Sequence, residues 1–483
     1  MNSVLGATDK NNLTKPASSE QILSGAFKPP QVFKNSNLVR IINLEKGYPK
    51  ETVNVIIENV ASSPQDEYFL PFTATQMENI GVLEVKDRKN VDSPLFEVEA
   101  VEIDPESDIQ FYRIRLPAPL APGAQQTLGI NYAFLSSLYP LPATINQQES
   151  QFLVYDTSAY APSAYPTLKQ KTEIKFPSTN IKEHTVIPGK AGESDSPQKQ
   201  GSKFTYGPFE DIPAGAVESI SVRYEFTKPL INVSKLERDI EVSHWGGNVA
   251  FEDRYTLHNR AANLTKQFDR VQWASTQYYN PPTTAIKSLT FPLRVGSLDP
   301  YYTDTIGNVS TSKFRSNKRE ALLELKPRYP IFGGWNYPFR VGWNADSTKF
   351  LRKLKSGDGF VLNVPFLEGP KQNEGITYED VELRVILPEG ATNVDYYTTV
   401  PLTSTTITTH KTYMDTLGRT TLVLRARNIN DDLRDRELIV TYNYPFLAGL
   451  RKPLVIFSGM LAIFATAYVV GSLDTRIAAK KRN

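Results

Sequence analysis

One apolar stretch near the C-terminus constrains this fold more than any other feature. Residues 454–473 read LVIFSGMLAIFATAYVVGSL and contain no charged side chain. Twenty residues of α-helix, at about 1.5 Å per residue, span a hydrocarbon core about 30 Å thick. Nothing in the residues that follow could cover such a helix in a soluble core. The sequence therefore predicts one transmembrane helix over 454–473.

A basic tail follows the predicted span. Residues 475–483 read TRIAAKKRN, and positive charge beside a span is typical of its cytosolic side. Lys480 and Lys481 stand fourth and third from the end, which resembles the dilysine retrieval signal of endoplasmic reticulum membrane proteins; a plain stop-transfer cluster is the alternative. We expect 474–483 to be a short cytosolic tail and the bulk of the chain to lie in the lumen of the endoplasmic reticulum.

Small residues form a stripe inside the predicted span. Ser458, Ala462 and Thr466 are four residues apart and share one face of a helix. Such a stripe lets another helix approach closely. Chance spacing in a span rich in Ala and Gly explains it equally well, so a helix contact here is a hypothesis.

The N-terminal residues carry no obvious targeting signal. Residues 1–34 are polar, and we expect a flexible leader. The first fifteen residues contain no apolar segment long enough for a signal peptide. Either the sequence begins after a processed or truncated start, or the chain inserts by its C-terminal anchor with its bulk in the cytosol. Sequons for N-glycosylation suit a lumenal location, and they stand at Asn12, Asn232, Asn263 and Asn308.

Composition and motifs exclude several kinds of site. The chain has no cysteine, which removes thiol catalysis, disulfides and cysteine-type zinc sites. Lys and Arg (54) nearly balance Asp and Glu (52), and a net charge of +2 gives no general attraction to nucleic acid. The four histidines show no H-E-x-x-H spacing, and the chain has neither a G-x-S-x-G elbow nor a P-loop. We therefore predict no catalytic, cofactor-binding or metal-binding residues.

Apolar and polar residues alternate through most of the chain. ISVRYEF (220–226) and LIVTYNY (438–444) show the period of two that is typical of a strand with one buried face. We predict a mainly β fold with two tandem antiparallel β-sandwich-like lumenal domains, over 35–228 and 229–447, that share one plan. The segment 314–326 is the best candidate for a short helix.

Residues 330–343, PIFGGWNYPFRVGW, concentrate aromatic side chains on one strand. Pro338 cannot donate a ladder hydrogen bond, which predicts an edge strand or a strand start. The glycine pair permits a sharp turn. The favoured interpretation is a packed aromatic corner of the second domain; the alternative is a surface for a peptide, a glycan or a neighbouring subunit. The aromatic residues concerned are Trp335, Tyr337, Phe339 and Trp343.

The same stretch resembles a known family. KPRYPIFGGWNYPFRVGW (326–343) closely resembles the signature of the ribophorin I family, a subunit of the oligosaccharyltransferase complex. The similarity covers most of 35–473, and it is greater to the short-tailed fungal form than to the animal form with its long cytosolic domain. Further segments resemble the family in the same order: TYGPFEDIP (205–213), LERDIEVSHWGGNVAFEDRY (236–255), DPYYTDTIGNVSTS (299–312) and VELRVILPEGA (381–391).

The resemblance implies a non-catalytic subunit of an endoplasmic reticulum membrane complex. A different, polytopic subunit transfers a dolichol-linked glycan to Asn of nascent proteins, and this chain lacks the W-W-D-Y-G motif expected of that subunit. The family member would stabilise the complex and help to present acceptor chains. Its implied partners are the catalytic subunit, the other subunits, the membrane and nascent polypeptides.

Two other function classes stay open at this point. A membrane-anchored hydrolase would need a site built from residues such as His244, Glu252 and Asp253. A free-standing lectin or chaperone-like receptor of the endoplasmic reticulum membrane would use the aromatic strand 335–343. Activity of the isolated lumenal region would favour the hydrolase, and stable isolation without partner subunits would favour the receptor.

Overall fold

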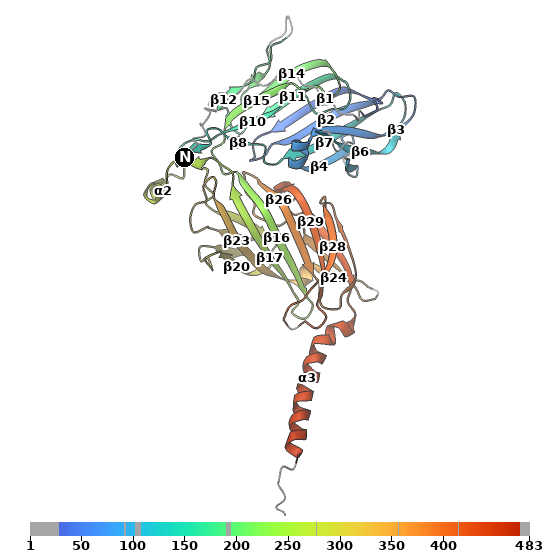
Figure 1. Cartoon of the computed structure of the whole chain (residues 1–483), viewed down its shortest axis with the longest axis vertical. Coiled ribbons are helices and arrows are strands. Elements are labelled where there is room, and N and C mark those ends of the chain that lie inside the picture. Colours follow the sequence, from blue (N-terminus) through green and yellow to red (C-terminus); the bar gives the residue numbers. More distant parts are fainter. Residues whose placement is uncertain are drawn as a thin grey trace, which may run out of the picture.

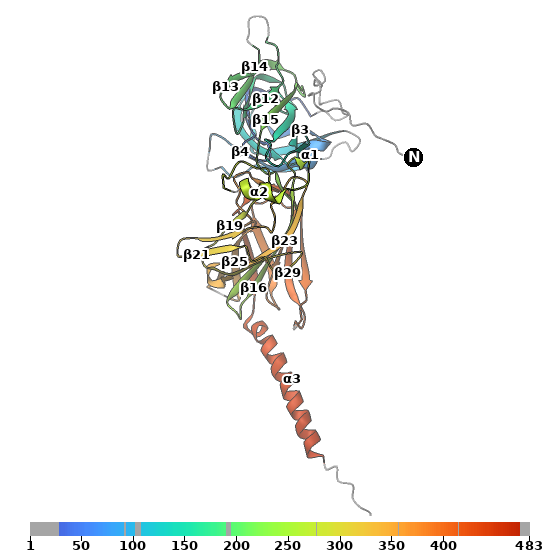
Figure 2. The same ribbon diagram turned by 90° about the vertical axis from the view of Figure 1, so that its left-hand side faces the viewer.

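The computed structural model arranges three parts one after another along a single long axis (Figure 1; Figure 2). Two β halves follow each other, and one helix continues from the second half. The predicted leader over 1–34 lies mostly outside the described residues, although Phe33 and Lys34 already belong to the first strand. The structure describes residues 29–90, 93–101, 108–189, 195–276, 278–355, 357–413 and 415–473.

The described residues of the first half form three sheets of their own. Its elements are β1 (Phe33–Asn43), β2 (Lys50–Asn59), β3 (Gln65–Thr73), α1 (Ala74–Asn79), β4 (Ile80–Asp87), β5 (Glu97–Val101), β6 (Ile109–Leu120), β7 (Gln125–Phe134), β8 (Tyr139–Pro140), β9 (Thr144–Ile145), β10 (Phe152–Ser158), β11 (Thr167–Lys175), β12 (Ile181–His184), β13 (Gln198–Gln200), β14 (Lys203–Ile212) and β15 (Ser219–Glu225). The strand orders are β13-β14-β11-β1-β2-β7-β4, β12-β15-β10-β8 and β3-β6-β5.

The second half also contains three sheets. Its elements are β16 (Ile231–Ser243), β17 (Asn248–Asn259), β18 (Asn263–Leu264), α2 (Arg270–Thr276), β19 (Leu289–Leu293), β20 (Ser297–Asp304), β21 (Lys313–Ser316), β22 (Ala321–Leu325), β23 (Asn336–Asp346), η1 (Ser347–Lys349), β24 (Leu351–Lys353), β25 (Gly359–Pro365), β26 (Ile376–Ile386), β27 (Thr392–Thr398), β28 (Ser404–His410), β29 (Arg419–Asn430), η2 (Asp431–Leu433) and β30 (Glu437–Asn443). The strand orders are β20-β23-β17-β16-β26-β29-β28, β24-β25-β30-β27 and β19-β22-β21.

The two halves share one topology. When β9 and β18 are set aside, matching the remaining strands in chain order pairs β1 with β16, β2 with β17, β11 with β26 and β15 with β30, and each of the three sheets then has the same strand order in both halves. In each seven-stranded sheet one pair is parallel, β1 with β11 and β16 with β26, and the other pairs are antiparallel. These parallel pairs depart from the antiparallel sheets expected, because a period of two records the buried face and not the direction of the neighbouring strand.

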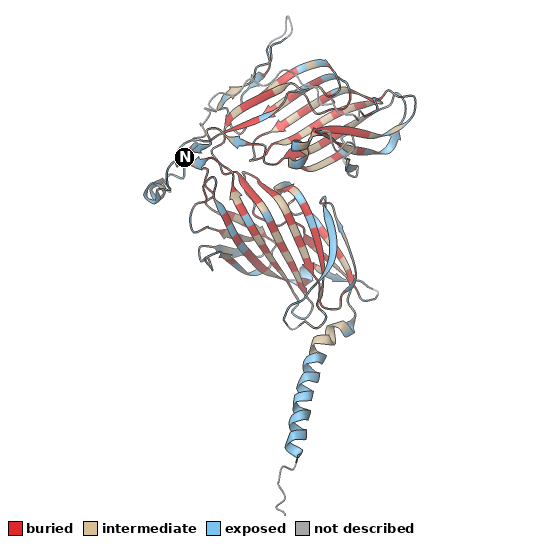
Figure 3. Ribbon diagram, in the orientation of Figure 1, coloured by how far each residue is buried: buried red, intermediate tan, exposed pale blue. Residues whose placement is uncertain are grey.

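The two smaller sheets of each half cover the same face of the seven-stranded sheet. In β1, Leu38 belongs to the core shared with the three-stranded sheet, and Ile42 belongs to the core shared with the four-stranded sheet. In β16, Leu236 and Ile240 hold the matching positions in one continuous core. Buried residues alternate with more exposed ones along these strands (Figure 3). Each half is therefore a two-layer sandwich, and the mainly β prediction is confirmed.

The predicted helix over 314–326 is wrong. This segment forms the hairpin of β21 and β22, in which alternate residues of β22 are buried in the core. Its turn is held by the side-chain oxygen of Asn317, which accepts hydrogen bonds from the backbone N–H groups of Arg319 and Glu320. A short apolar run does not distinguish the two structures by itself, and here pairing with a neighbouring strand decides.

The aromatic strand β23 is not an edge strand, because it lies between β17 and β20. The alternative prediction, a strand start, is confirmed. Pro338 is the third residue of β23 and faces Thr256 of β17. On the other side of β23, the pairing with β20 ends at Asp304 and Phe339. No residue of β20 is therefore paired with Pro338, and the missing N–H of Pro338 is tolerated.

The C-terminal helix α3 (Phe446–Ser472) confirms the predicted span. Its most apolar 18 residues have a mean hydropathy of 2.1, and none of them is buried in the protein. It begins at Phe446 rather than at Leu454, so its first two turns precede the apolar stretch. Pro453 lies inside the helix, at the boundary between these two parts.

Candidate functional site

Three of the four aromatic residues singled out over 335–343 lie in the core. Tyr337, Phe339 and Trp343 are 2%, 4% and 2% exposed. The ring of Trp343 stacks on Phe251 with centroids 5.5 Å apart, and Phe339 stacks on Tyr255 at 4.8 Å. Aromatic pairs at these distances stabilise the contact between two strands. These side chains therefore join β23 to β17 and present no surface to a partner.

The glycine pair before β23 allows two backbone segments to cross closely. A Cβ atom on Gly333 would overlap the carbonyl oxygens of Ala261 and Ala262. Gly334 has a φ of +78°, and a Cβ atom there would overlap the side-chain oxygen of Asn263. Only glycine fits both conditions at low cost. This geometry supports the interpretation as a packed corner.

Trp335 differs from its neighbours because it is only partly buried. It lines an open recess of about 450 Å³ together with Phe268, Tyr329 and Asn336. In the loop that follows α2, Tyr278 and Tyr279 are 90% and 88% exposed. Exposed aromatic side chains of this kind are enriched at protein interfaces. Of the four aromatic residues singled out, Trp335 is thus the one that remains open to a partner.

The structure does not bring the candidate hydrolase residues together. Asp253 is fully buried and accepts hydrogen bonds of 2.7 and 2.9 Å from Arg238; burial raises its pKa to about 6, against the opposing effect of Arg238. Glu252 lies on the opposite face of β17. His244, beyond the end of β16, contacts the Tyr442 hydroxyl at 2.8 Å. Among the described residues, no group of three or more His, Asp or Glu side chains has the arrangement of a metal site.

The sequons differ in accessibility. Asn263 and Asn308 are exposed. Asn232 is only 3% exposed, and its side-chain amide is hydrogen-bonded at both its nitrogen and its oxygen. A glycan at Asn232 is therefore incompatible with this packing. Asn12 lies outside the described residues.

The small-residue stripe lies on an exposed face of α3. The hydroxyls of Ser458 and Thr466 donate to carbonyls of the same helix, the latter to Ala462 at 2.7 Å. This satisfies the polar atoms without a second helix. The helix contact stays a prediction, and the retrieval signal at Lys480 and Lys481 lies outside the described residues.

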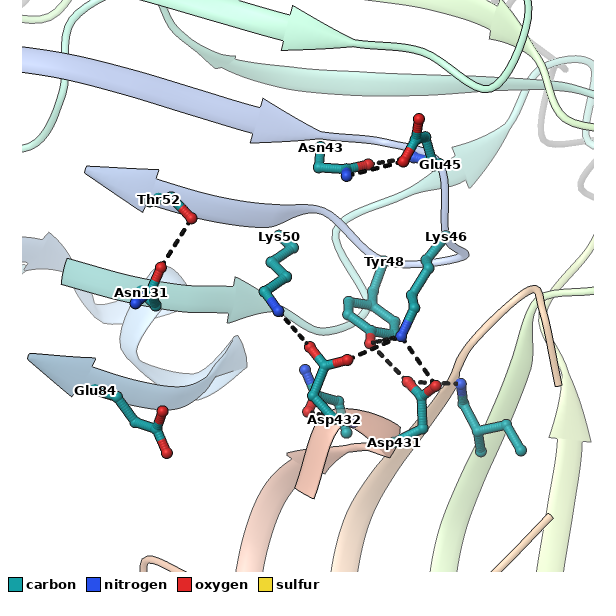
Figure 4. Close-up of polar contacts among 12 residues, drawn as sticks. Asn43, Glu45, Lys46, Tyr48, Lys50, Thr52, Glu84, Asn131, Asp431 and Asp432 are labelled. Atoms are coloured by element: carbon teal, nitrogen blue, oxygen red, sulfur yellow. Dashed lines mark hydrogen bonds and ion pairs between the residues drawn. The ribbon is translucent and has the colours of Figure 1, made fainter. Parts of the chain in front are cut away.

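The turn between β1 and β2 docks onto the second half (Figure 4). The Lys46 ammonium forms ion pairs with Asp431 and Asp432 at 3.0 and 2.9 Å, and Lys50 reaches Asp432 at 2.7 Å. The Tyr48 hydroxyl donates to Asp431 at 2.6 Å. Burial acts to raise the pKa of Asp432, but the hydrogen bonds from Lys50 and Lys46 outweigh it and hold the pKa below its usual value. We call this group of five residues the interdomain clamp.

Further contacts join the halves. Arg436 and Glu84 form an ion pair of 3.0 Å, and the amide of Asn428 donates to the Glu78 carbonyl. The short strands β9 and β18, one from each half, pair in parallel. The interdomain contact is thus distributed over several places along both halves.

The matching turn of the second half, between β16 and β17, docks onto α3. Pro453 has no N–H, so the carbonyl of Gly449, four residues earlier, lacks its helical donor. The indole N–H of Trp245 donates to that carbonyl at 2.7 Å. The Lys452 ammonium forms an ion pair with Asp415 at 2.7 Å. These contacts, which we call the membrane junction, attach the start of α3 to the second half.

The sequence shows the parts of the membrane junction but not their pairing. Trp245 stands in the turn-like SHWGG, and Pro453 directly precedes the apolar stretch. No spacing rule links residues that are 204 positions apart. A proline at the start of a span leaves the carbonyl four residues earlier without its helical donor. That is the only signal in the sequence that another donor is needed there.

The chain matches the model of the Ribophorin I family over residues 33–471, which includes both halves and nearly all of α3. This chain belongs to the ribophorin I family. Among similar proteins of that family, a Schizosaccharomyces pombe protein named dolichyl-diphosphooligosaccharide–protein glycosyltransferase subunit 1 is 31% identical over 93% of this chain and 97% of its own length.

Two more relatives carry closely related names. The subunit 1 of Caenorhabditis elegans is 31% identical over 94% of this chain and 75% of its own length. The subunit 1B of Arabidopsis thaliana is 29% identical over 94% of this chain and 96% of its own length. Among solved structures, an M1 zinc metallopeptidase from Deinococcus radiodurans is 13% identical and covers 44% of this chain and 42% of its own, with a TM-score of 0.27. That likeness is too low to bear on function.

Proposed function

We propose that this ribophorin I family member is subunit 1 of an oligosaccharyltransferase complex, anchored in the endoplasmic reticulum membrane by α3. The observation that carries the proposal is the family match over 33–471. A match confined to one half would point only to a shared β module. This match includes the tandem halves and the helix, so the whole architecture is that of the family.

In this proposal the chain is a non-catalytic subunit that supports transfer of a dolichol-linked glycan to Asn of nascent proteins. It stabilises the complex and helps to present acceptor chains, while a polytopic partner subunit performs the transfer. The burial of Asp253 in an ion pair and the distributed contacts between the halves support a scaffolding role. The recess at Trp335 is the surface we assign to a partner subunit or an acceptor chain.

The proposed orientation places both halves in the lumen and the basic tail in the cytosol. The exposed sequons at Asn263 and Asn308 are then the expected glycan acceptors within the described residues. Endoglycosidase treatment should increase gel mobility, and Asn263→Gln and Asn308→Gln should each remove one step of that shift. A chain without any shift would contradict the proposed acceptors, and protease protection in sealed microsomes would then decide the orientation.

The first experiment is purification of the tagged chain in a mild detergent, followed by mass spectrometry of its companions. Recovery of a polytopic glycosyltransferase and its partners in fixed stoichiometry is the expected result. A chain that purifies alone would overturn the proposal. Depletion of the chain should also lower the occupancy of sequons in other glycoproteins, and unchanged occupancy would contradict the role in N-glycosylation.

A further inference from the structure

A recess of about 620 Å³ lies where the second half meets α3. Its upper wall comes from three separate loops and strand ends of the second half, which contribute Trp245, Glu389 and Arg419. Its lower wall is the first part of α3, including Lys452 and Met460. This volume is within the range of small-molecule sites in proteins. The recess has no part in the function proposed above.

The lining changes from charged to apolar along the helix axis. Lys452 marks the level at which the apolar stretch begins, and Ile456, Phe457 and Met460 follow below it. Met460 lies about 12 Å deeper than Lys452 at the rise of an α-helix. The recess therefore crosses from the membrane interface into the hydrocarbon region. Only a molecule with a polar end and an apolar end matches both parts.

The polar end has more carboxylates than cations, because Asp415 pairs with both Lys452 and Arg419. Glu241 and Glu389 line the recess together with Arg419 and Lys452. Arg419 forms an ion pair with Glu241, and its charge is thereby compensated. With three carboxylates beside two cations, the polar end favours a headgroup that carries its own ammonium over an anion.

One carboxylate oxygen in this lining lacks a partner. Glu389 is 5% exposed, and its Oε1 accepts hydrogen bonds from the hydroxyl and N–H of Thr416 and from the N–H of Leu417. Its Oε2 is buried and has no hydrogen-bond partner among the described residues. Nη1 of Arg451, near Gly390, is likewise buried without a hydrogen-bond partner among the described residues. A buried oxygen of this kind costs free energy unless a donor reaches it.

We propose that this recess binds one phospholipid whose headgroup carries a primary ammonium, of the phosphatidylethanolamine class. The ammonium donates to Glu389, the phosphate lies against Lys452, and one acyl chain follows Ile456 to Met460. A choline headgroup has no N–H to donate, which disfavours phosphatidylcholine. A partner helix could pack on Ile456, Phe457 and Met460, but it would not match the charged side chains at the upper wall. The proposal needs α3 in a membrane but not the glycosyltransferase complex.

The test measures which lipids stay with the protein. The full chain is placed in nanodiscs of equal parts phosphatidylethanolamine, phosphatidylcholine and phosphatidylglycerol, then transferred to mild detergent, and the retained lipids are quantified by mass spectrometry. We expect phosphatidylethanolamine to be retained about tenfold over the other two, the ratio that one charge-assisted hydrogen bond supplies. Equal retention of all three lipids, or a preference for phosphatidylglycerol, would overturn the proposal.

Two variants and a control localise the effect. Glu389→Gln keeps the shape of the side chain but removes the charge, and it should reduce the preference to about parity. Met460→Trp fills the apolar end and should lower the retention of every lipid. Glu437→Gln, an exposed residue of β30, should change neither. Unaltered preference in Glu389→Gln, with unaltered thermal unfolding, would place the lipid elsewhere and contradict this site.

Discussion

The same turn does different work in the two halves. In the first half, the turn between β1 and β2 carries Lys46 and Tyr48 and docks onto the second half. In the second half, the matching turn between β16 and β17 carries Trp245 and docks onto α3. Because the halves share their topology and stand in series, each turn faces the next part of the chain (Figure 1). A repeated fold has thus supplied two different joints at one structural position.

The chemistry of the two joints differs with their surroundings. The interdomain clamp consists of ion pairs at partly exposed positions, where water and salt weaken them. The membrane junction also contains an ion pair, Lys452 with Asp415, and adds an indole N–H that satisfies a backbone carbonyl beside the membrane, where an unpaired carbonyl is costly. The comparison indicates that salt and pH act on the ion pairs of the clamp, whereas the indole hydrogen bond of the junction involves no ionised group.

A second matched pair lies in the cores. Arg40 of β1 and Arg238 of β16 occupy equivalent positions, three residues after the point at which pairing with the neighbouring strand resumes beyond a bulge. Arg40 binds the single carboxylate of Glu51, whereas Arg238 binds both Asp253 and Glu368.

The largest predicted effect comes from removing these arginines. Arg238→Ala should destabilise the second half by about 5 kcal/mol, because it leaves two buried carboxylates without a cation. Arg40→Ala should cost the first half less, about 3 kcal/mol, because the hydroxyls of Tyr132 and Tyr155 still donate to Glu51. Differential scanning calorimetry of the two β halves measures both effects.

The control for the arginine pair is Arg425→Ala. This arginine is 56% exposed in its side chain and pairs with Glu382 on the sheet surface, so we expect a loss below about 1 kcal/mol. Equal losses of unfolding free energy for Arg40→Ala and Arg238→Ala would show that the destabilisation does not depend on the number of carboxylates that each arginine pairs with.

The next prediction compares two glycines that lie in equivalent loops of the two halves. Gly333 precedes β23, and Gly123 precedes β7. Gly333→Ala should cost about 3 kcal/mol, because the added Cβ meets backbone oxygens that cannot rotate away. Gly123→Ala should cost about 1 kcal/mol, since its φ of +73° is unfavourable for alanine but the space around it is open. Urea unfolding curves of the two variants provide the comparison, and a loss for Gly123→Ala as large as that for Gly333→Ala would contradict it.

A smaller and local effect is expected at the membrane junction. Trp245→Phe keeps an aromatic ring but removes the donor to the Gly449 carbonyl, at a cost of about 1 kcal/mol. Hydrogen exchange should increase at residues 446–453 and stay unchanged in the β sheets. Trp273→Phe, on α2 in the same half, is the control that should leave exchange at 446–453 unaltered. Faster exchange throughout the second half would argue against a local joint.

The smallest effect concerns the interdomain clamp and its response to pH. The pKa of Asp432 is lowered in the folded chain, so its contribution is present above the ordinary pKa of an aspartate, about 3.9, and is lost as the pH falls below that value. Asp432→Asn should weaken the clamp by about 1 kcal/mol at neutral pH. Residues 226–230 connect β15 to β16 and so join the two halves, and limited proteolysis there should detect the loosening. The cleavage rate of the variant should change less with acid than that of the unmodified chain. A variant that responds to acid as strongly as the unmodified chain would assign the response to other groups.

Local sequence patterns predict much of this fold. A period of two is a property of each strand by itself, so ISVRYEF and LIVTYNY indicated sheets with one buried face. The uncharged stretch before Leu473 indicated the membrane helix for the same reason, because solubility in lipid depends on composition alone. The prediction failed at 314–326, where a short apolar run fits either a helix or a hairpin.

The joints between the parts required the folded chain. Lys46 and Asp431 are 385 positions apart, and Trp245 and Gly449 are 204 apart. No local preference links such residues, since their meeting depends on how two sheets stack and where a helix leaves the second half. The parallel pairs β1–β11 and β16–β26 depend likewise on crossovers that the strand pattern does not record. The amino-acid pattern therefore specifies the strands and the span, and packing over long sequence separations specifies how they are joined.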